Sequence, residues 1–301
     1  MNVALLLLPD FLLICAGAAL KRTRGFDTAF WPGLERLVYF ILFPALLFRS
    51  LARSPLSLAA AGPLVSVALA YTLAGMALSA LARPLFHMPR PVFAACFQCG
   101  FRFNTYLALA ITSRLAGERG LAAVSLLVGV LVPVVNVAAV AMLAERRSAI
   151  VREIARNPLV LSCVAGIAWH ITGWPLPDTA DHLLSLLAGA SLPLGLIAVG
   201  AGLVFGAGHL APGPLAWWAT LKLGVLPAIA FAVGRALALP VAELQAAVVL
   251  AAVPTAPSAY ILAMQMTGMG APVALLISTG TMIAAITLPL WVAALAGGAL
   301  R

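Results

Sequence analysis

Charged residues are scarce in this sequence of 301 residues. Only 9% of them are Asp, Glu, Lys or Arg, whereas hydrophobic residues make up 63%. A soluble domain usually carries about 25% charged residues, which help to cover its surface. So little charge excludes an ordinary water-soluble domain. The sequence instead predicts an all-α integral membrane protein.

Acidic residues and catalytic motifs are also lacking. Nine residues are Asp or Glu, and there is no GxSxG, no HExxH and no acidic cluster, so we expect neither an enzyme nor a resident metal or cofactor. The one CxxC pair, Cys96 and Cys99, has no second pair of the kind that zinc sites use. The net charge of +9 comes mainly from arginines at the ends of apolar stretches. That pattern indicates membrane topology and not nucleic-acid binding.

Apolar stretches run through the whole chain, separated by charged residues, Pro or Gly. Most are about 20 residues long, the length that crosses a bilayer as a helix. They predict ten spans, at Val3–Leu20, Leu34–Leu51, Leu58–Ala82, Val92–Ile111, Leu121–Leu143, Pro158–Ile171, His182–Phe205, Leu215–Leu237, Leu244–Met266 and Val273–Ala296.

Lys and Arg are unevenly divided between the two ends of these spans. Odd-numbered connections hold ten of them, and even-numbered connections together with the termini hold six. Cytoplasmic loops carry the excess of positive charge. We therefore expect odd connections in the cytoplasm and both termini on the non-cytoplasmic side.

The two halves of the chain resemble each other. Pro44 corresponds to Pro193 at an offset of 149 residues, and Tyr106 corresponds to Tyr260 at an offset of 154. Gly17 corresponds to Gly166, again at an offset of 149. Because each half holds an odd number of spans, the second half must enter the membrane inverted. Inverted repeats are typical of secondary transporters.

Helix interruptions are predicted in the fourth and ninth spans, which are equivalent in the repeat. The fourth contains Gln98, Arg102 and Asn104 within one apolar stretch, where polar groups are costly. The ninth contains Pro254 and Pro257, which remove two backbone donors. Irregular backbone inside a membrane is tolerated where it lines a cavity, so we expect two broken helices at a midplane binding site.

Such a site suits a carboxylate, because the helix N-termini at the breaks carry partial positive charge and free N–H groups. Arg102 either attracts the anion, extends to an interface or pairs with a carboxylate. The residues expected to bind substrate or shape the site are Asn104, Thr105, Arg102, Pro254, Thr255, Pro257 and Ser258, followed by Gln98, Tyr260 and Gln265.

Two further charges lie within apolar stretches. Asp10 follows Pro9 in the first span and is a candidate for proton coupling, or for pairing with Arg102 or Lys222. Lys222 is either a structural cation at the half-helix ends, a proton-linked group or a lysine that extends to the interface.

Several segments resemble bacterial members of the auxin efflux carrier family. They are Phe43–Phe48, Arg102–Leu107 and Pro254–Ala263, together with Asn157-Pro158-Leu159 and Leu192-Pro193-Leu194. The resemblance implies two inverted repeats of five spans, crossing broken helices four and nine, and elevator-like alternating access. It implies organic-anion substrates such as auxin or malonate. We expect Pro9, Pro44 and Pro193 to break helices.

The chain is therefore expected to form one transporter domain over residues 1–301, with inverted repeats at about 1–147 and 157–301. The expected function is a secondary transporter for a small mono- or dicarboxylate in a bacterial inner membrane. A sodium- or proton-coupled exchanger or symporter is the alternative. Its partners would be the anion, the lipid bilayer and, in one assembly, a second copy of the chain.

Overall fold

The computed structural model describes residues 3–23, 26–27, 29–54, 58–143, 157–203 and 209–296, and at 3–7, 58–60, 265 and 296 it describes the backbone only. These residues form helices and short connections, with no strand among them. The all-α class is therefore confirmed for the described part of the chain. The polar stretch Ala144–Arg156 between the two halves lies outside the described residues.

The helices of the first half begin and end close to the predicted limits. They are α1 (Val3–Leu20), α2 (Phe30–Leu37), the π-turn η1 (Val38–Leu42), α3 (Phe43–Ala52), α4 (Leu58–Phe86), α5 (Arg90–Phe97), the 3₁₀ turn η2 (Gln98–Gly100) and α6 (Thr105–Leu143). α6 contains the end of the fourth predicted span and the whole of the fifth. The two parts meet at a bend at Gly117, where φ is +59°. A positive φ suits glycine, which has no side chain to clash with the backbone.

The second half is also helical. Its elements are α8 (Pro158–Thr172), α9 (Asp178–Gly202), α10 (Pro212–Thr220), the π-turn η3 (Leu221–Val225), α11 (Leu226–Ala236), α12 (Val241–Ala252), α13 (Ser258–Thr267) and α14 (Gly270–Ala296). Prolines begin several of these helices, where the missing N–H has no partner to lose.

Five helical stretches are long and apolar enough to cross a membrane: Ala61–Phe86, Arg90–Leu143, Asp178–Gly202, Pro212–Ala236 and Gly270–Leu295. Shorter apolar helices, at Leu8–Leu20, Pro158–Thr172 and Val241–Ala252, account for much of the rest. The predicted ninth span is divided between α12 and α13 by an interruption, which explains why neither piece reaches full length. Ten spans therefore stay a prediction.

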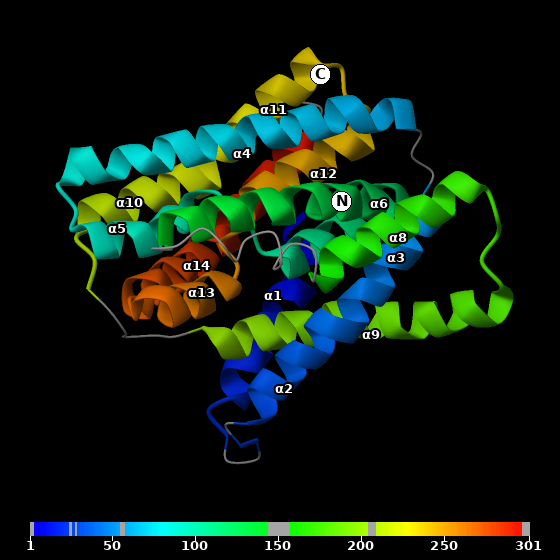
Figure 1. The fold of residues 1–301 in the computed structure, drawn as a ribbon, viewed down its shortest axis with the longest axis horizontal. Helices are drawn as coiled ribbons and strands as arrows, with labels where there is room; N and C mark the ends of the chain where they lie inside the picture. Colours follow the sequence, from blue (N-terminus) through cyan, green and yellow to red (C-terminus); the bar gives the residue numbers. More distant parts are fainter. Residues whose placement is uncertain are drawn as a thin grey trace.

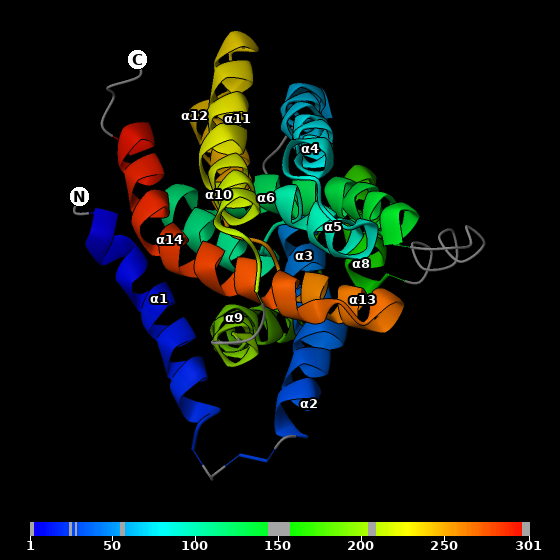
Figure 2. The same ribbon diagram turned by 90° about the vertical axis from the view of Figure 1, so that its left-hand side faces the viewer.

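The helices pack in two groups. Group 1 consists of α1, α2, α3, α8 and α9, and group 2 of α4 to α6 and α10 to α14. Figures 1 and 2 show α1, α2, α3 and α9 on one side of the molecule and α4, α10, α11 and α12 on the opposite side. α5, α6 and α14 lie between them, and α6 makes most of the contacts between the groups.

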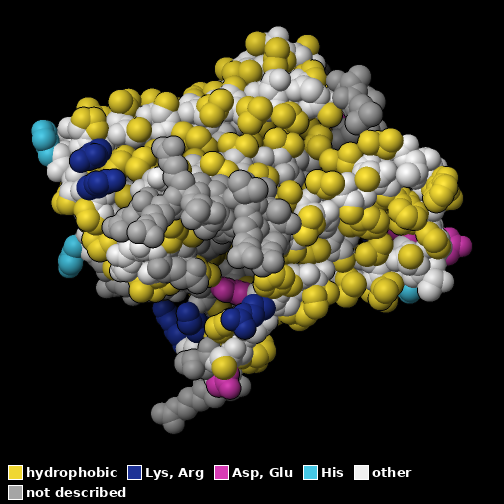
Figure 3. Space-filling model, in the orientation of Figure 1, with side chains coloured by type: hydrophobic (Ala, Val, Ile, Leu, Met, Phe, Trp, Pro, Cys, Tyr) yellow, Lys and Arg dark blue, Asp and Glu magenta, His cyan; other side chains and the backbone are white. Residues whose placement is uncertain are grey.

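Large hydrophobic side chains are exposed on many helices. Figure 3 shows hydrophobic side chains spread over much of the described part of one face, with Lys and Arg confined to a few small places. Ile286, Leu290 and Val164 are each more than half exposed. An apolar exterior of this extent would aggregate in water and suits a lipid environment.

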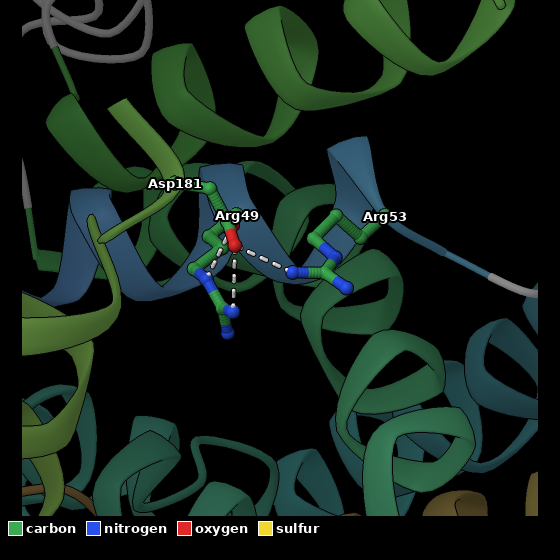
Figure 4. Close-up of polar contacts among 3 residues, drawn as sticks. All are labelled: Arg49, Arg53 and Asp181. Atoms are coloured by element: carbon green, nitrogen blue, oxygen red, sulfur yellow. Dashed lines mark hydrogen bonds and ion pairs between the residues drawn. The ribbon is translucent and has the colours of Figure 1, made fainter. Parts of the chain in front are cut away.

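A polar contact fastens two helices of group 1 at one end. Arg49 of α3 donates through Nε to Asp181 of α9 at 2.8 Å, and Arg53 Nη1 lies 2.6 Å from the same carboxylate (Figure 4). Arg49 lies in the last turn of the second predicted span, Arg53 follows that span, and Asp181 precedes the seventh. These two connections therefore lie at the same end of the bundle.

Close backbone approaches within group 1 include two at glycines that correspond in the predicted repeat. A Cβ added at Gly17 of α1 would overlap the carbonyl oxygen of Ile197 in α9, and one added at Gly166 of α8 would lie 2.8 Å from the carbonyl oxygen of Phe48 in α3. Small residues let membrane helices approach each other in this way.

Single prolines do not break the helices as expected. Pro9 and Pro193 lie inside α1 and α9, which continue through them. Pro44 lies in the first turn of α3, directly after the π-turn η1. A π-turn bonds each N–H one residue further back, so the chain absorbs the missing donor without a break. α1 and α9 therefore continue past Pro9 and Pro193, against expectation, whereas beside Pro44 the α-helix is interrupted by the π-turn η1 without a break in the helical chain.

Candidate functional site: two interrupted helices

The first interruption separates α5 and η2 from α6. Residues 101–104 are non-helical, and the helix restarts at Thr105. Asn104 causes the restart, because its side-chain Oδ1 accepts hydrogen bonds from the backbone N–H groups of Tyr106 (3.1 Å) and Leu107 (3.2 Å). Asparagine is among the preferred residues for capping a helix N-terminus.

The second interruption separates α12 from α13. Val253 is extended, with φ −66° and ψ 148°, as expected for a residue that precedes proline. Residues 254–256 are non-helical, and Pro257 precedes the first residue of α13. Pro254 and Pro257 both lack an N–H, which removes the donors that would have continued α12.

Direct hydrogen bonds join the two interruptions. The backbone N–H of Asn104 donates to the carbonyl oxygen of Pro254 at 2.8 Å. The hydroxyl of Thr255 donates to the carbonyl oxygen of Cys99, also at 2.8 Å. The predicted interruptions are thus present, and the fold brings them into contact although they lie about half a chain apart. We call this contact the crossing.

The side-chain amide of Asn104 is the polar group at the crossing that the protein leaves unsatisfied. Asn104 is 1% exposed, and its Nδ2 has no hydrogen-bond partner in the described part of the chain. A buried donor without a partner costs about 1–3 kcal/mol. Thr105 and Tyr106, which follow it, are half-buried. The amide therefore keeps unused hydrogen-bond donors.

Arg102 is held by neutral amides close to the crossing. Its Nη1 donates to Gln98 Oε1 and its Nη2 to Asn136 Oδ1, both at 2.7 Å. Gln98 in turn donates to the carbonyl oxygen of Ala259 beyond the second interruption, at 3.1 Å. Sequence reasoning missed Asn136, although an asparagine inside an apolar stretch was the available signal.

The remaining predicted site residues differ in accessibility. Thr255 is 5% exposed and Pro254 is buried, whereas Pro257 is half-buried next to Gly202, at the end of α9. Ser258 is exposed and Tyr260 is half-buried. The side chain of Gln265 lies outside the described residues. Thr255 donates its hydroxyl to the backbone, so it supports the crossing.

The two deep charges are placed differently from each other. Asp10 is fully buried and pairs with Arg114 of α6, whose Nη2 lies 2.9 Å from its Oδ1. The expected pairing with Arg102 or Lys222 is therefore wrong, because α1 packs against the part of α6 that carries Arg114. Lys222 is 3% exposed, and its ammonium donates to the carbonyl oxygen of Ala251 at 2.6 Å.

A small pocket lies beside Lys222, with room for about one water molecule. The residues that line it include Cys99, Trp218, Lys222, Pro254, Thr255 and Gly280. The described residues contain no group of three or more His, Cys, Asp or Glu side chains that could hold a metal ion. The arrangement can offer hydrogen bonds and positive potential to an anion.

Residues 147–292 match a family model described as "membrane transport protein". This match covers nearly half of the chain and includes Lys222 and the second interruption. No curated protein matches the chain. The matched family and the apolar helices together indicate a multi-pass membrane protein with a role in transport.

Proposed function

We propose that this protein is a secondary carrier for a small organic anion with one or two carboxylates, auxin- or malonate-like in size. We further propose that it belongs to the auxin efflux carrier family and works by elevator-like alternating access in a bacterial inner membrane. The family match over residues 147–292 supports the transport role.

The observation that carries the proposal is the buried, unpartnered amide of Asn104 at the crossing. Helices α6 and α13 begin at the two interruptions. The backbone N–H groups of their first turns bear partial positive charge. A carboxylate placed there would accept hydrogen bonds from the Asn104 amide and be stabilised by both helix ends. Arg102 adds positive potential nearby.

The inverted repeat is supported by equivalent contacts in the two halves. Gly17 of the first predicted span packs on α9, in the seventh, and its counterpart Gly166 of the sixth packs on α3, in the second. Each half thus contributes the same pair of spans to group 1. A two-group arrangement lets one group move against the other, which alternating access requires.

Contacts between connections support the proposed topology. Lys21 of the first connection donates to Ala201 at the end of α9, near the seventh connection, at 2.6 Å. Arg119 of the fourth pairs with Glu243 of the eighth at 2.9 Å. Both pairs join connections of equal parity, as does the pair between Arg49 and Asp181. Odd connections in the cytoplasm and both termini on the other side are consistent with this.

The alternative, a cation or proton exchanger, calls for carboxylates at the crossing. The fully buried carboxylates of the described residues are Asp10 and Glu243, and each is paired with an arginine. Arg114 and Glu243 lie roughly three helical turns along the chain from the interruptions. An anion carrier therefore fits the crossing better.

Binding to the purified protein tests the proposal, with thermal unfolding as the readout. Mono- and dicarboxylates that bind only the folded state raise the unfolding midpoint. Asn104→Ser keeps an oxygen for the helix cap but removes the amide donor. We expect this variant to lose the ligand-induced rise while unfolding near the wild-type temperature without ligand.

Asn157 provides the matched control. It caps α8 in the same way, accepting from the N–H groups of Leu159 (3.0 Å) and Val160 (3.3 Å). Asn157→Ser should retain the ligand-induced rise. An equal response to ligand in Asn104→Ser and wild type would overturn the assignment of Asn104.

A further inference from the structure

Lys222 is a buried cation that pairs with no carboxylate of the described residues. It lies in the π-turn η3 and is 3% exposed. Its ammonium donates to the carbonyl oxygen of Ala251, and no ion pair of the described residues includes it. A buried ammonium is unfavourable unless other groups compensate its charge. The compensation must come from oxygens with partial negative charge.

The end of α12 supplies those oxygens. Ala251 lies in the last turn of this helix, which ends at Ala252 where the second interruption begins. The last four carbonyl groups of a helix lack partners within the helix, and together they carry a partial negative charge. Lys222 therefore neutralises a helix C-terminus that is buried at the crossing.

The corresponding helix end at the first interruption is satisfied without a charge. The carbonyl oxygen of Phe97 accepts from the hydroxyl of Ser79 at 2.7 Å, and that of Cys99 accepts from Thr255 at 2.8 Å. Neutral hydroxyl groups are thus sufficient at one interruption, whereas the other uses a full positive charge. The crossing is chemically asymmetric.

The pocket beside Lys222 is bordered by residues that carry oxygen ligands. It is bordered by the hydroxyl-bearing Thr255 and by Cys99, whose carbonyl oxygen faces Thr255. Carbonyl and hydroxyl oxygens are ligands that hard cations prefer. Space for one water molecule, in addition to the volume of an ammonium group, matches a small ion with little or no hydration.

We propose that the ammonium of Lys222 occupies the place that a coupling alkali cation would take at the end of α12, so that the carrier binds and moves its anion without sodium. The fixed charge compensates the helix end and adds positive potential for the anion on the crossing. The transport consequence rests on the proposed carrier function, whereas the replacement of a cation does not.

Thermal unfolding in equal concentrations of sodium, potassium or choline chloride tests the replacement. Wild-type protein should unfold at the same temperature in all three salts. Lys222→Ala removes the ammonium and leaves space beside the α12 carbonyls. This variant should unfold at a lower temperature in choline and recover in sodium, because a bound ion stabilises the folded state.

Lys21 offers the matched control, since its ammonium also donates to a carbonyl oxygen near a helix end, that of Ala201, at 2.6 Å. It lies in the first connection, outside both interruptions. Lys21→Ala should lower the unfolding temperature equally in all three salts. A sodium response in this variant as large as that of Lys222→Ala would overturn the proposal.

Anion uptake into proteoliposomes tests the consequence. Lys222→Met keeps the volume but removes the charge, so uptake should fall about tenfold in every salt, the effect of losing one charge-assisted contact. Lys222→Ala should recover uptake in sodium only. If Lys222→Ala cannot be purified in any salt, Lys222→Met still tests the proposal, because its uptake should be lower than that of the wild-type protein.

Three further results would also overturn the proposal: sodium-stabilised wild-type protein, a salt-independent Lys222→Ala variant, or wild-type uptake by Lys222→Met. A failure of the proposed carrier function would look different from these results. Wild-type protein would then take up no carboxylate into proteoliposomes, while the salt dependence of unfolding would still test the role of Lys222.

Discussion

At the scale of single residues, the burial of Asp10 depends on one arginine. Asp10 on α1 is fully buried, and Arg114 Nη2 lies 2.9 Å from its Oδ1. This contact is an ion pair by distance, and neither carboxylate oxygen of Asp10 has a partner in hydrogen-bond geometry in the described structure. Removing the partner of a buried ion pair costs about 3–5 kcal/mol, because an uncompensated charge stays behind.

Arg114→Gln should therefore lower the free energy of unfolding by about 3 kcal/mol at neutral pH. The loss should shrink as the pH falls, because the unpaired carboxylate becomes neutral when it takes up a proton, and it should grow as the pH rises. Asp10→Asn in the same background should restore most of the stability. Denaturant unfolding at several pH values measures this. A loss that is independent of pH would contradict an ionised Asp10 in the pair.

The sequence identified the deep charges but not their partners. Asp10 and Lys222 stand out because charge is rare inside apolar stretches. Arg114 lies far from Asp10 in the sequence, and the packing of α1 against α6 brings them together. The same holds for Arg102 and Asn136. In the sequence Asn104 and Thr255 look alike, and only the fold shows that Thr255 is satisfied while the Asn104 amide is not.

At the scale of helices, close approaches at equivalent glycines hold group 1 together. Gly17→Ala and Gly166→Ala should each lower the free energy of unfolding by about 1–3 kcal/mol, because a methyl group has no room beside the facing backbone. Gly189 in α9 has nothing within 4 Å of an added Cβ. Gly189→Ala should leave stability unchanged or raise it by up to about 1 kcal/mol, since alanine favours helix. Unfolding in detergent measures all three, and equal effects would contradict the packing account.

Helix limits were largely predictable from the sequence, and the interruptions were too. Prolines, glycines and charges at the ends of apolar stretches predicted α1, α4 and α9 to within a few residues. The pair Pro254 and Pro257 predicted the second interruption. Isolated prolines misled, because one missing N–H can be absorbed in a continuing helix or a π-turn. Two missing donors three residues apart cannot be absorbed in this way.

At the scale of the whole molecule, two groups of helices meet largely through α6. This helix begins at the crossing, carries Arg114 toward α1 and contacts α3, α8 and α9. Movement of group 2 against group 1 would carry the crossing and any bound anion with it. From the sequence, the division into two groups could be inferred only through the predicted repeat, because tertiary packing determines which helices contact each other.

The central claim is that the protein is a carrier that moves a small organic anion through the crossing. Counterflow in proteoliposomes tests it most directly, because only a carrier exchanges labelled for unlabelled substrate. With an unlabelled carboxylate inside, entry of the labelled compound should rise well above that into empty liposomes, and Asn104→Ser should reduce it while Asn157→Ser should not. No counterflow of any mono- or dicarboxylate by folded wild-type protein would contradict the claim.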